Sequence, residues 1–182
     1  SSSKAAAVLT VNTWYKNYKF PCIITNSVNN FGKFQFVEKF IPRSILLGLN
    51  QKSIELYGQG KNIRTWVSVE DHVRALILVS NKGKIGETYN ISSEYKLRNI
   101  DVAKKIVNIL KKKNIKTNIR FVKDRLKHDR HYSIKANKIK KLGWKPFNNF
   151  EEDLINTIEW YIKNENINFF KDIKKHLMRK GI

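Results

Sequence analysis

The sequence has little cysteine and no long apolar run. Cys22 is the single cysteine among 182 residues, so an internal disulfide is excluded. A reducing, cytosolic setting is therefore expected. No segment is apolar for long enough to span a membrane, and no secretory signal peptide is visible. These absences argue against a secreted disulfide scaffold and against a membrane-spanning protein.

Acidic side chains are scarce, and basic ones dominate. The chain has 36 Lys and Arg against 15 Asp and Glu, which gives a formal net charge of +21. An excess of this size often marks binding to nucleic acid or to another anionic surface. The lysines are spread along the chain, however, with residues 111–113 as the one dense run, and Asn and Ile are abundant too. This combination favours a biased codon composition over nucleic-acid binding. An anionic small-molecule ligand is compatible with either interpretation.

The chain also lacks an initiating methionine. Residues 1–7 run directly into an apolar helical pattern, which indicates a truncated start. A length of 182 residues suffices for one domain with a core, or for part of a larger one.

Helical and strand patterns alternate along the chain, and no internal repeat is visible. Apolar residues at helical spacing, with their start and stop signals, predict helices at residues 3–19, 38–49, 70–79, 99–110, 136–142 and 150–163. Short apolar or alternating runs predict strands at residues 21–25, 54–57, 64–69, 87–91 and 119–122. This order indicates an α/β architecture and fits an all-β fold or a helical bundle badly.

Two stretches of this pattern point to ligand binding. Residues 26–32 are polar, turn-prone and placed just past a predicted strand, where open α/β sheets bind ligands. Residues 57–72 combine a two-glycine turn, a strand with two different faces that carries Arg64, and a helix start where Glu70 or Asp71 is expected as N-cap. This corner could bind an anion, although an ordinary hairpin with a solvated arginine has the same pattern.

Taken in order from residue 1 to about 163, these segments resemble the C-terminal half of dTDP-glucose 4,6-dehydratases. That family belongs to the extended short-chain dehydrogenase/reductase superfamily. Ser1 to Lys4 resemble the end of its Tyr-x-x-x-Lys motif, with the tyrosine immediately before Ser1. The other matching segments are residues 25–32, 36–42, 57–72, 86–91, 99–101, 124–130 and 142–146.

The resemblance implies the C-terminal part of an extended Rossmann-type NAD-binding fold plus the smaller substrate-binding domain. Residues 1–32 would end the NAD-binding domain. Residues 33–163 would mostly bind the nucleotide sugar, with some segments returning to the Rossmann sheet, and residues 164–182 would form a basic tail. The family's glycine-rich turn, catalytic tyrosine and acidic pair would lie upstream. This fragment is therefore expected to be inactive alone and to fold poorly because of bare sheet edges.

The implied reaction is that of a lyase acting on dTDP-glucose. Hydride leaves sugar C4 for NAD⁺, water is eliminated across C5 and C6, and hydride returns at C6 to give dTDP-4-keto-6-deoxyglucose. The resemblance also implies a homodimer, paired through helices that include the one beginning at Lys4.

The resemblance assigns one catalytic residue, Lys4. Its ammonium would lower the pKa of the tyrosine one helical turn earlier, so that this tyrosine can take the C4 hydroxyl proton. The cofactor-binding residues would be Ser1, Ser2, Ser3, Lys4 and Asn30. Without the resemblance, Lys4 is an exposed lysine at a helix start, and Asn30 is half of a turn-forming pair with Asn29.

The substrate-binding residues implied by the resemblance are Asn29, Lys39, Phe40, Tyr57, Arg64, Asn99, Asp124, Arg125 and His128. Arg64 is the strongest candidate because a guanidinium binds a diphosphate bidentately. Tyr57 could stack near the thymine, and Asn99 could assist the phosphates or simply cap a helix. Phe40 could equally be core.

Two observations limit these assignments. Leu126 and Lys127 stand where the family usually has Pro-Gly, which puts the contacts of Arg125 and His128 in doubt. His72, His131 and His176 lack the spacing of metal ligands, so no metal is assigned.

Three other interpretations stay open. The chain could come from a nucleotide-sugar epimerase or decarboxylase of the same superfamily, although the Asn29–Asn30 pair and the loop at 125–130 favour the dehydratase. It could be a nucleic-acid-binding module, which only the charge supports. It could also be a decayed gene product without activity.

Overall fold

The computed structural model describes residues 2–124 and 131–164. The predictions made for Ser1, Arg125, His128, the Leu126–Lys127 pair and residues 165–182 lie outside the described residues.

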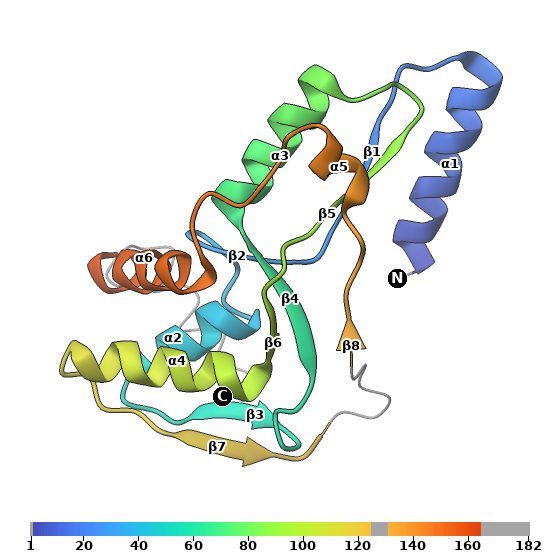
Figure 1. Cartoon of the computed structure of the whole chain (residues 1–182). Coiled ribbons are helices and arrows are strands. Elements are labelled where there is room, and N and C mark those ends of the chain that lie inside the picture. Colours follow the sequence, from blue (N-terminus) through green and yellow to red (C-terminus); the bar gives the residue numbers. More distant parts are fainter. Residues whose placement is uncertain (1, 125–130, 165–182) are drawn as a thin grey trace.

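The chain forms helices and short strands in alternation (Figure 1). The helices are α1 (Ser2–Tyr18), α2 (Phe40–Leu49), α3 (Val69–Lys82), α4 (Asn99–Lys112), α5 (Asn137–Lys141) and α6 (Phe150–Lys163). The strands are β1 (Ile24–Ser27), β2 (Asn29–Phe31), β3 (Ile54–Tyr57), β4 (Ile63–Ser68), β5 (Thr88–Ile91), β6 (Lys96–Arg98), β7 (Ile119–Val122) and β8 (His131–Tyr132). The predicted α/β architecture is confirmed. None of the helices described here combines the length and hydropathy that crossing a membrane requires.

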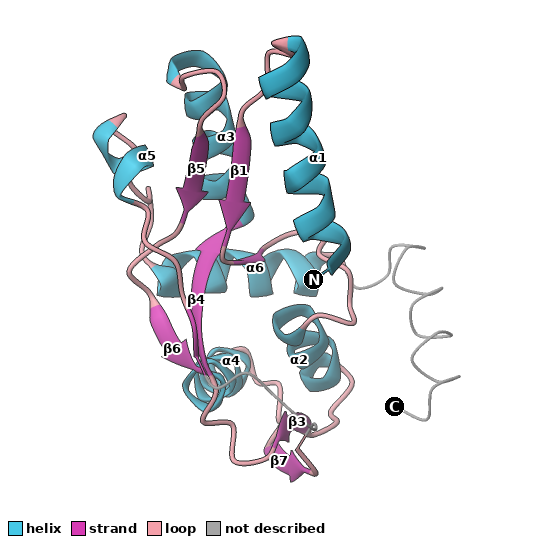
Figure 2. Cartoon of the chain, turned by 90° about the vertical axis from the view of Figure 1, so that its right-hand side faces the viewer, coloured by secondary structure: helices cyan, strands magenta, loops and turns pink. Residues whose placement is uncertain are grey.

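The strands pair mostly in parallel. β1 pairs with β5, β2 with β4, β4 with β8, and β3 with β7, all in parallel, while β4 and β6 are antiparallel. In both views β4 runs between an upper part, with α1, β1, β5 and α3, and a lower part, with α2, α4, β3 and β7 (Figures 1 and 2). β4 therefore joins the two parts.

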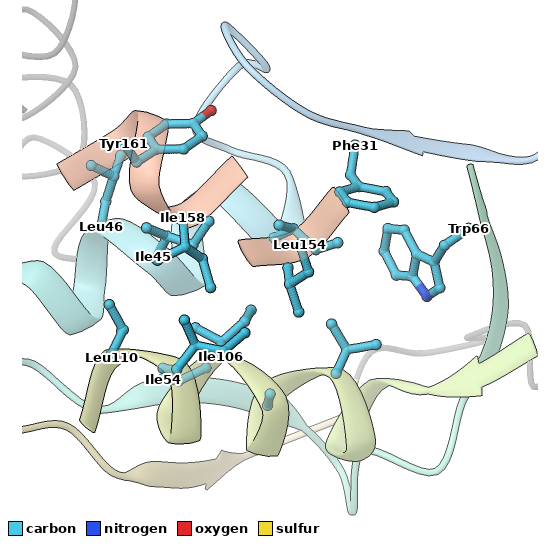
Figure 3. Packing of buried hydrophobic residues seen from close by; sticks show 14 of the residues in the cluster. Phe31, Ile45, Leu46, Ile54, Trp66, Ile106, Leu110, Leu154, Ile158 and Tyr161 are labelled. Carbon is cyan, nitrogen blue, oxygen red and sulfur yellow. The ribbon is translucent and has the colours of Figure 1, made fainter. Parts of the chain in front are cut away.

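The lower part has a closed hydrophobic core, shown in Figure 3, which we call the α2–α4–α6 core. Its side chains come from one face of each of these helices, from β3, and from Phe31 and Trp66. Ile106 of α4 and Leu154 of α6 are fully buried. The apolar spacing that predicts these helices also supplies this core, because residues three and four apart lie on one helix face.

A second cluster, the α3–β5–α5 core, lies in the upper part. Ala75 and Val79 of α3 pack in one cluster with Ile91 of β5 and Ile139 of α5. The buried Asp71 holds the segment that follows α5, because its side chain accepts a hydrogen bond from the Phe147 N–H at 3.0 Å. The segment that leads into α6 is thereby fastened to the start of α3.

Helix α1 differs from the other helices because none of its residues is buried. Leu9, Trp14 and Tyr18 have exposed fractions of 68%, 53% and 71%. Trp14 and Tyr18 pack on each other, with ring centroids 5.4 Å apart. The helix predicted at 3–19 is present, but its apolar side chains are largely uncovered within the described structure.

The two-glycine turn is confirmed. Gly58 and Gly60 have φ values of +56° and +65°, in the left-handed region that suits glycine. The Gly60 N–H donates to the Tyr57 carbonyl at 3.0 Å and closes the turn.

Some local predictions are wrong. The N-cap of α3 is Ser68, whose hydroxyl accepts from the Asp71 N–H at 3.3 Å, and Glu70 and Asp71 lie in the first turn instead. A serine oxygen suits this role as well as a carboxylate does. The burial of β4 does not alternate as the predicted two-faced strand would, because Ile63 and Arg64 are both half-buried and residues 65–68 are all buried.

Other errors concern strands. The loop expected at 26–32 instead contains the end of β1 and all of β2, and the strand expected at 21–25 begins at Ile24. β6 and β8 have no counterpart among the predicted strands. Polar residues form strands here because pairing with β4 and β5 satisfies their backbone groups.

Candidate functional site

A cavity of about 230 Å³ lies against β3, β4 and the starts of α2 and α4. The residues that line it are Asn29, Glu38, Lys39, Phe40, Arg43, Ser44, Leu47, Glu55, Leu56, Tyr57, Arg64, Trp66 and Asn99. Six of them are predicted substrate-binding residues: Asn29, Lys39, Phe40, Tyr57, Arg64 and Asn99. The fold therefore brings residues from five separate segments to one cavity.

Aromatic side chains form one part of this cavity. Trp66 of β4 is buried, and its ring lies 6.2 Å from that of Phe40 and 6.3 Å from that of Phe31. Asn29 is the register partner of Trp66 across the β2–β4 pair. Phe40 therefore packs against the core and also lines the cavity.

Arg64 lies near the start of β4 and is half-buried. Its Nη1 donates to the carbonyl oxygen of Ile63 at 2.8 Å. The guanidinium group of an arginine is always charged in proteins. Arg64 can therefore offer a positive charge to a ligand in the cavity.

Tyr57 ends β3, and the glycine turn follows it. A Cβ on Gly58 would come within 2.7 Å of the Asp124 Oδ2 atom, so the absence of a side chain lets Asp124 approach this turn. Asp124 itself is exposed and is not among the residues that line the cavity.

Three buried polar atoms of the lining have no hydrogen-bond partner among the residues that the structure describes. They are Arg43 Nε, Trp66 Nε1 and Asn99 Oδ1. Buried polar groups are nearly always paired, and leaving one unpaired costs about 1–3 kcal/mol. Two unpaired donors and one unpaired acceptor around one cavity indicate a ligand that carries both acceptors and donors.

Asn99 does not act as a helix cap. The N-cap position of α4 belongs to Arg98, and no side chain there makes a capping hydrogen bond. The alternative prediction of simple capping by Asn99 is therefore wrong. Arg98 instead binds Asp101 at 2.7 Å, and this hydrogen bond lowers the pKa of the Asp101 carboxyl.

Sequence analysis missed several lining residues, among them Arg43 and Glu55. Arg43 Nη2 donates to Glu55 Oε2 at 2.5 Å. The other carboxylate oxygen of Glu55 accepts from Arg120. The sequence marks each of them as a charged residue inside an otherwise apolar helix or strand pattern, but nothing local indicates that the two pair.

The predicted cofactor residues lie elsewhere. Ser2, Ser3 and Lys4 are exposed in the first turn of α1 and do not line the cavity. Asn30 follows Asn29 on β2, so the two side chains point to opposite faces of the strand. Asn30 Oδ1 accepts from the Ser27 hydroxyl at 3.2 Å. The structure thus gathers six of the nine predicted substrate residues at one cavity, without Asp124 and without Lys4.

A second cavity, of about 370 Å³, lies between α3 and α6. Charged residues in its lining pair with each other: Lys33 with Glu70 at 3.5 Å, and Arg74 with Asp71. None of the three unpaired atoms described above belongs to this lining, so it carries less indication of a ligand. Within residues 2–124 and 131–164, no group of three or more His, Cys, Asp or Glu side chains could hold a metal ion.

This chain is similar in sequence to several dTDP-glucose 4,6-dehydratases. A dTDP-glucose 4,6-dehydratase of Shigella flexneri is 45% identical over 172 residues, covering 91% of this chain and 48% of that protein. The corresponding Escherichia coli K12 protein is 45% identical over 170 residues, covering 90% of this chain and 47% of its own length. This chain spans about half the length of the curated relatives that it matches.

Solved structures agree in fold. The Bacillus anthracis dTDP-glucose 4,6-dehydratase, solved in complex with NAD, has a TM-score of 0.84 at 40% identity, covering 91% of this chain and 52% of that one. A Thermotoga maritima UDP-glucose 4-epimerase has a TM-score of 0.82 at 22% identity, covering 90% of this chain and 53% of that one, which shows the fold alone.

These matches confirm the predicted resemblance and the extended Rossmann-type fold class. The family model described as GDP-mannose 4,6 dehydratase matches residues 1–157, so most of the chain is covered by it. The chain therefore belongs to the GDP-mannose 4,6-dehydratase family.

Proposed function

We propose that this chain is the nucleotide-sugar-binding half of an NAD-dependent dTDP-glucose 4,6-dehydratase. The whole enzyme would oxidise the sugar at C4, eliminate water across C5 and C6, and reduce C6. The observation that carries this proposal is the cavity, where six separately predicted residues meet around three unpaired buried polar atoms. The 45% identity to named dehydratases supports the choice of reaction.

Each lining residue has a role in this proposal. Arg64 holds the diphosphate, because its planar fork of donors matches phosphate oxygens. Tyr57 lies beside the base, and Asn99 accepts a hydrogen bond from the ligand through its unpaired oxygen. Asn29, at the β2 end of the cavity, contacts the sugar. Lys39, at the N-cap position of α2, adds positive charge.

The residues proposed for NAD fit the cofactor by their chemistry. Ser2 and Ser3 supply hydroxyls, Lys4 an ammonium and Asn30 an amide, and these groups can bind ribose hydroxyls and a carboxamide. NAD, when bound, takes up and returns the hydride. In the whole enzyme, the Lys4 ammonium lowers the pKa of a tyrosine one helical turn before it, so that the tyrosine can accept the C4 hydroxyl proton.

The proposal includes the domain division and a homodimer in the cytosol. Residues 1–32 would complete the NAD-binding domain, residues 33–163 would mostly bind the substrate, and 164–182 would be a basic tail. The exposed Leu9, Trp14 and Tyr18 of α1 suit a contact with a second copy. Sedimentation of the whole enzyme tests this pairing. Leu9→Asp should produce a monomer, and a dimer that withstands this change would refute the role of α1.

Direct binding tests the proposed function. Calorimetric titration of the folded chain with thymidine diphosphate should show saturable binding, and Arg64→Ala should weaken it about tenfold or more. Lys33→Ala is the control, because Lys33 is a basic residue that lines the other cavity.

Two outcomes would contradict the proposal. The first is a folded chain, checked by circular dichroism, that does not bind thymidine diphosphate. The second is micromolar binding to mixed-sequence DNA that falls steeply with salt, which would favour a nucleic-acid-binding module instead.

A further inference from the structure

Arg43 is a charged side chain in an apolar setting. It lies on α2, and its neighbours Pro42 and Ser44 are buried in the fold. Its own side chain is only 16% exposed, and that of its partner Glu55 is 22% exposed. A half-buried ion pair costs desolvation energy, so its presence beside a cavity calls for a physical reason.

Glu55 is shared between two arginines. One carboxylate oxygen accepts from Arg43 and the other from Arg120. Two guanidinium groups and one carboxylate leave a net positive charge on this triad. Arg120 is 64% exposed and does not line the cavity, whereas Arg43 lines it. Arg43 and Glu55 pair where both side chains are mostly buried, so the excess positive charge of the triad lies on the exposed Arg120.

The donors of Arg43 are only partly used. Nη2 is bound to Glu55, while Nε is buried and has no partner among the described residues. A guanidinium is a rigid fork, so fixing one nitrogen restricts the direction of the others. Arg43 is thus held in place with one buried N–H still available to a ligand.

Glu55 also locates this donor within the cavity. Ile54 and Leu56 of β3 are buried in the α2–α4–α6 core, while Glu55 and Tyr57 alternate with them and share the other face of the strand. Tyr57 is the residue proposed to lie beside the base. The donor held by Glu55 therefore belongs to the end of the cavity assigned to the base, and Arg64 to the diphosphate.

We infer that Arg43, positioned by Glu55, determines base specificity by donating its Nε–H to a carbonyl oxygen of the nucleobase. This inference rests on the proposed function, because it takes the cavity to bind a nucleoside diphosphate. It predicts a preference for thymine, which carries two carbonyl groups, over adenine, which carries none. Glu55 is a positioning residue, and Arg43 contacts the ligand.

The test measures three dissociation constants on the full chain: for thymidine diphosphate, deoxyadenosine diphosphate and inorganic pyrophosphate. Wild type should bind thymidine diphosphate more tightly than deoxyadenosine diphosphate. Arg43→Met keeps an unbranched apolar stem but removes the guanidinium, and it should reduce this preference about tenfold. Its affinity for pyrophosphate should stay within about twofold of wild type, because the lost donor faces the base.

Matched variants control for loss of charge and of folding. Arg120→Met removes the other guanidinium from Glu55 and should leave the preference intact. Arg43→Lys keeps the charge but lacks the Nε fork, and it should lose the preference as Arg43→Met does. Glu55→Gln should lower the preference by loosening Arg43. Circular dichroism and a thermal melt establish that each variant is folded before its constants are compared.

The outcomes separate this inference from the proposed function. If wild type binds thymidine diphosphate and Arg64→Ala loses it, but Arg43→Met keeps the full base preference, the inference is wrong and the proposed function stands. If Arg43→Met weakens pyrophosphate as much as thymidine diphosphate, Arg43 contacts phosphate and the inference is wrong. If folded wild type binds neither nucleotide, both the inference and the proposed function are wrong.

Discussion

The α2–α4–α6 core and helix α1 differ in how completely their apolar side chains are covered. In the α2–α4–α6 core, Ile106 and Leu154 are fully buried by helices on several sides (Figure 3). Helix α1, in contrast, buries none of its residues, and its Leu9 is 68% exposed. The cavity proposed for the substrate lies against the covered core, whereas Lys4 lies on the uncovered helix.

This difference explains why one half of the predicted site is assembled and the other is not. The substrate residues are carried by elements that pack on each other within the chain, so their relative positions are set by buried contacts. The proposed cofactor residues of α1 lie on a helix without buried contacts in the described structure. The cavity at Arg64 therefore depends on elements that pack on each other within the chain.

The largest expected effect tests the difference in enclosure. Leu154→Ala in the α2–α4–α6 core should lower the free energy of unfolding by about 2–5 kcal/mol, because it empties a fully buried site. Leu9→Ala on α1 makes the same chemical change at a site that is 68% exposed, and it should change stability by less than about 0.5 kcal/mol. Urea unfolding followed by circular dichroism measures both. Equal losses in the two variants would show that α1 is packed as tightly as α6.

A smaller effect is expected at the junction between the two parts. Asp71 is buried, pairs with Arg74 and accepts the Phe147 N–H, so it ties α3 to the segment before α6. Asp71→Ala should cost about 1–3 kcal/mol, since it removes the hydrogen bonds that a buried carboxylate accepts from Arg74 and from the Phe147 N–H. The adjacent Glu70→Ala removes an exposed carboxylate from the Lys33 pair and should cost less than about 1 kcal/mol. If the urea midpoints of both variants coincide, the fastening role assigned to Asp71 is wrong.

The smallest effects are the pH responses of the two parts. Burial lowers the pKa of His72 in α3 below its ordinary value of 6.5. The unfolded chain therefore takes up this proton first, and the stabilisation from neutral His72 is complete above pH 6.5 and is lost as the pH falls below it. In the α2–α4–α6 core, burial raises the pKa of Tyr161, outweighing its hydrogen bond to the Gln35 carbonyl.

The contribution of Tyr161 to folding stability changes with pH in the opposite direction. Its stabilisation is complete below the ordinary tyrosine pKa of 10.0 and is lost as the pH rises through that value, because the unfolded chain ionises first. Urea unfolding at a series of pH values measures both the loss of stability in acid and the loss in alkali. His72→Gln should reduce the loss of stability that begins just below pH 6.5 and leave the alkaline loss unchanged, and Tyr161→Phe should reduce the alkaline loss alone. If the Tyr161→Phe variant still loses stability at alkaline pH as wild type does, another group causes that loss.

Motifs with a strong local cause were predicted well from the sequence. The turn at Gly58 and Gly60 needs backbone angles that glycine adopts easily, so two glycines at this spacing indicate it without tertiary information. Helix α6 has the predicted bounds, and Asn149 begins it with a capping box that Glu152 completes. The family motifs placed Asn29, Arg64 and Asn99 in one site, and the fold brings them to one cavity.

Features that depend on distant partners were not predictable in the same way. β2 is only three polar-rich residues long, and it is a strand because β4 lies beside it. Ser68, and not the acidic pair after it, caps α3, since its backbone sits just outside the first turn. The Arg43–Glu55 contact joins residues that are separated by a turn and belong to different elements. No periodicity within either segment expresses that pairing.

By itself, the sequence determined the order and type of the main elements, the family resemblance and the candidate site residues. These follow from local periodicity, turn chemistry and motif spacing. Tertiary structure alone decided which residues share the cavity, which polar atoms in it lack partners, and that α1 is left uncovered within the described chain. The physical reason is that burial and hydrogen-bond pairing at a site depend on side chains from distant segments, and only folding brings those segments together.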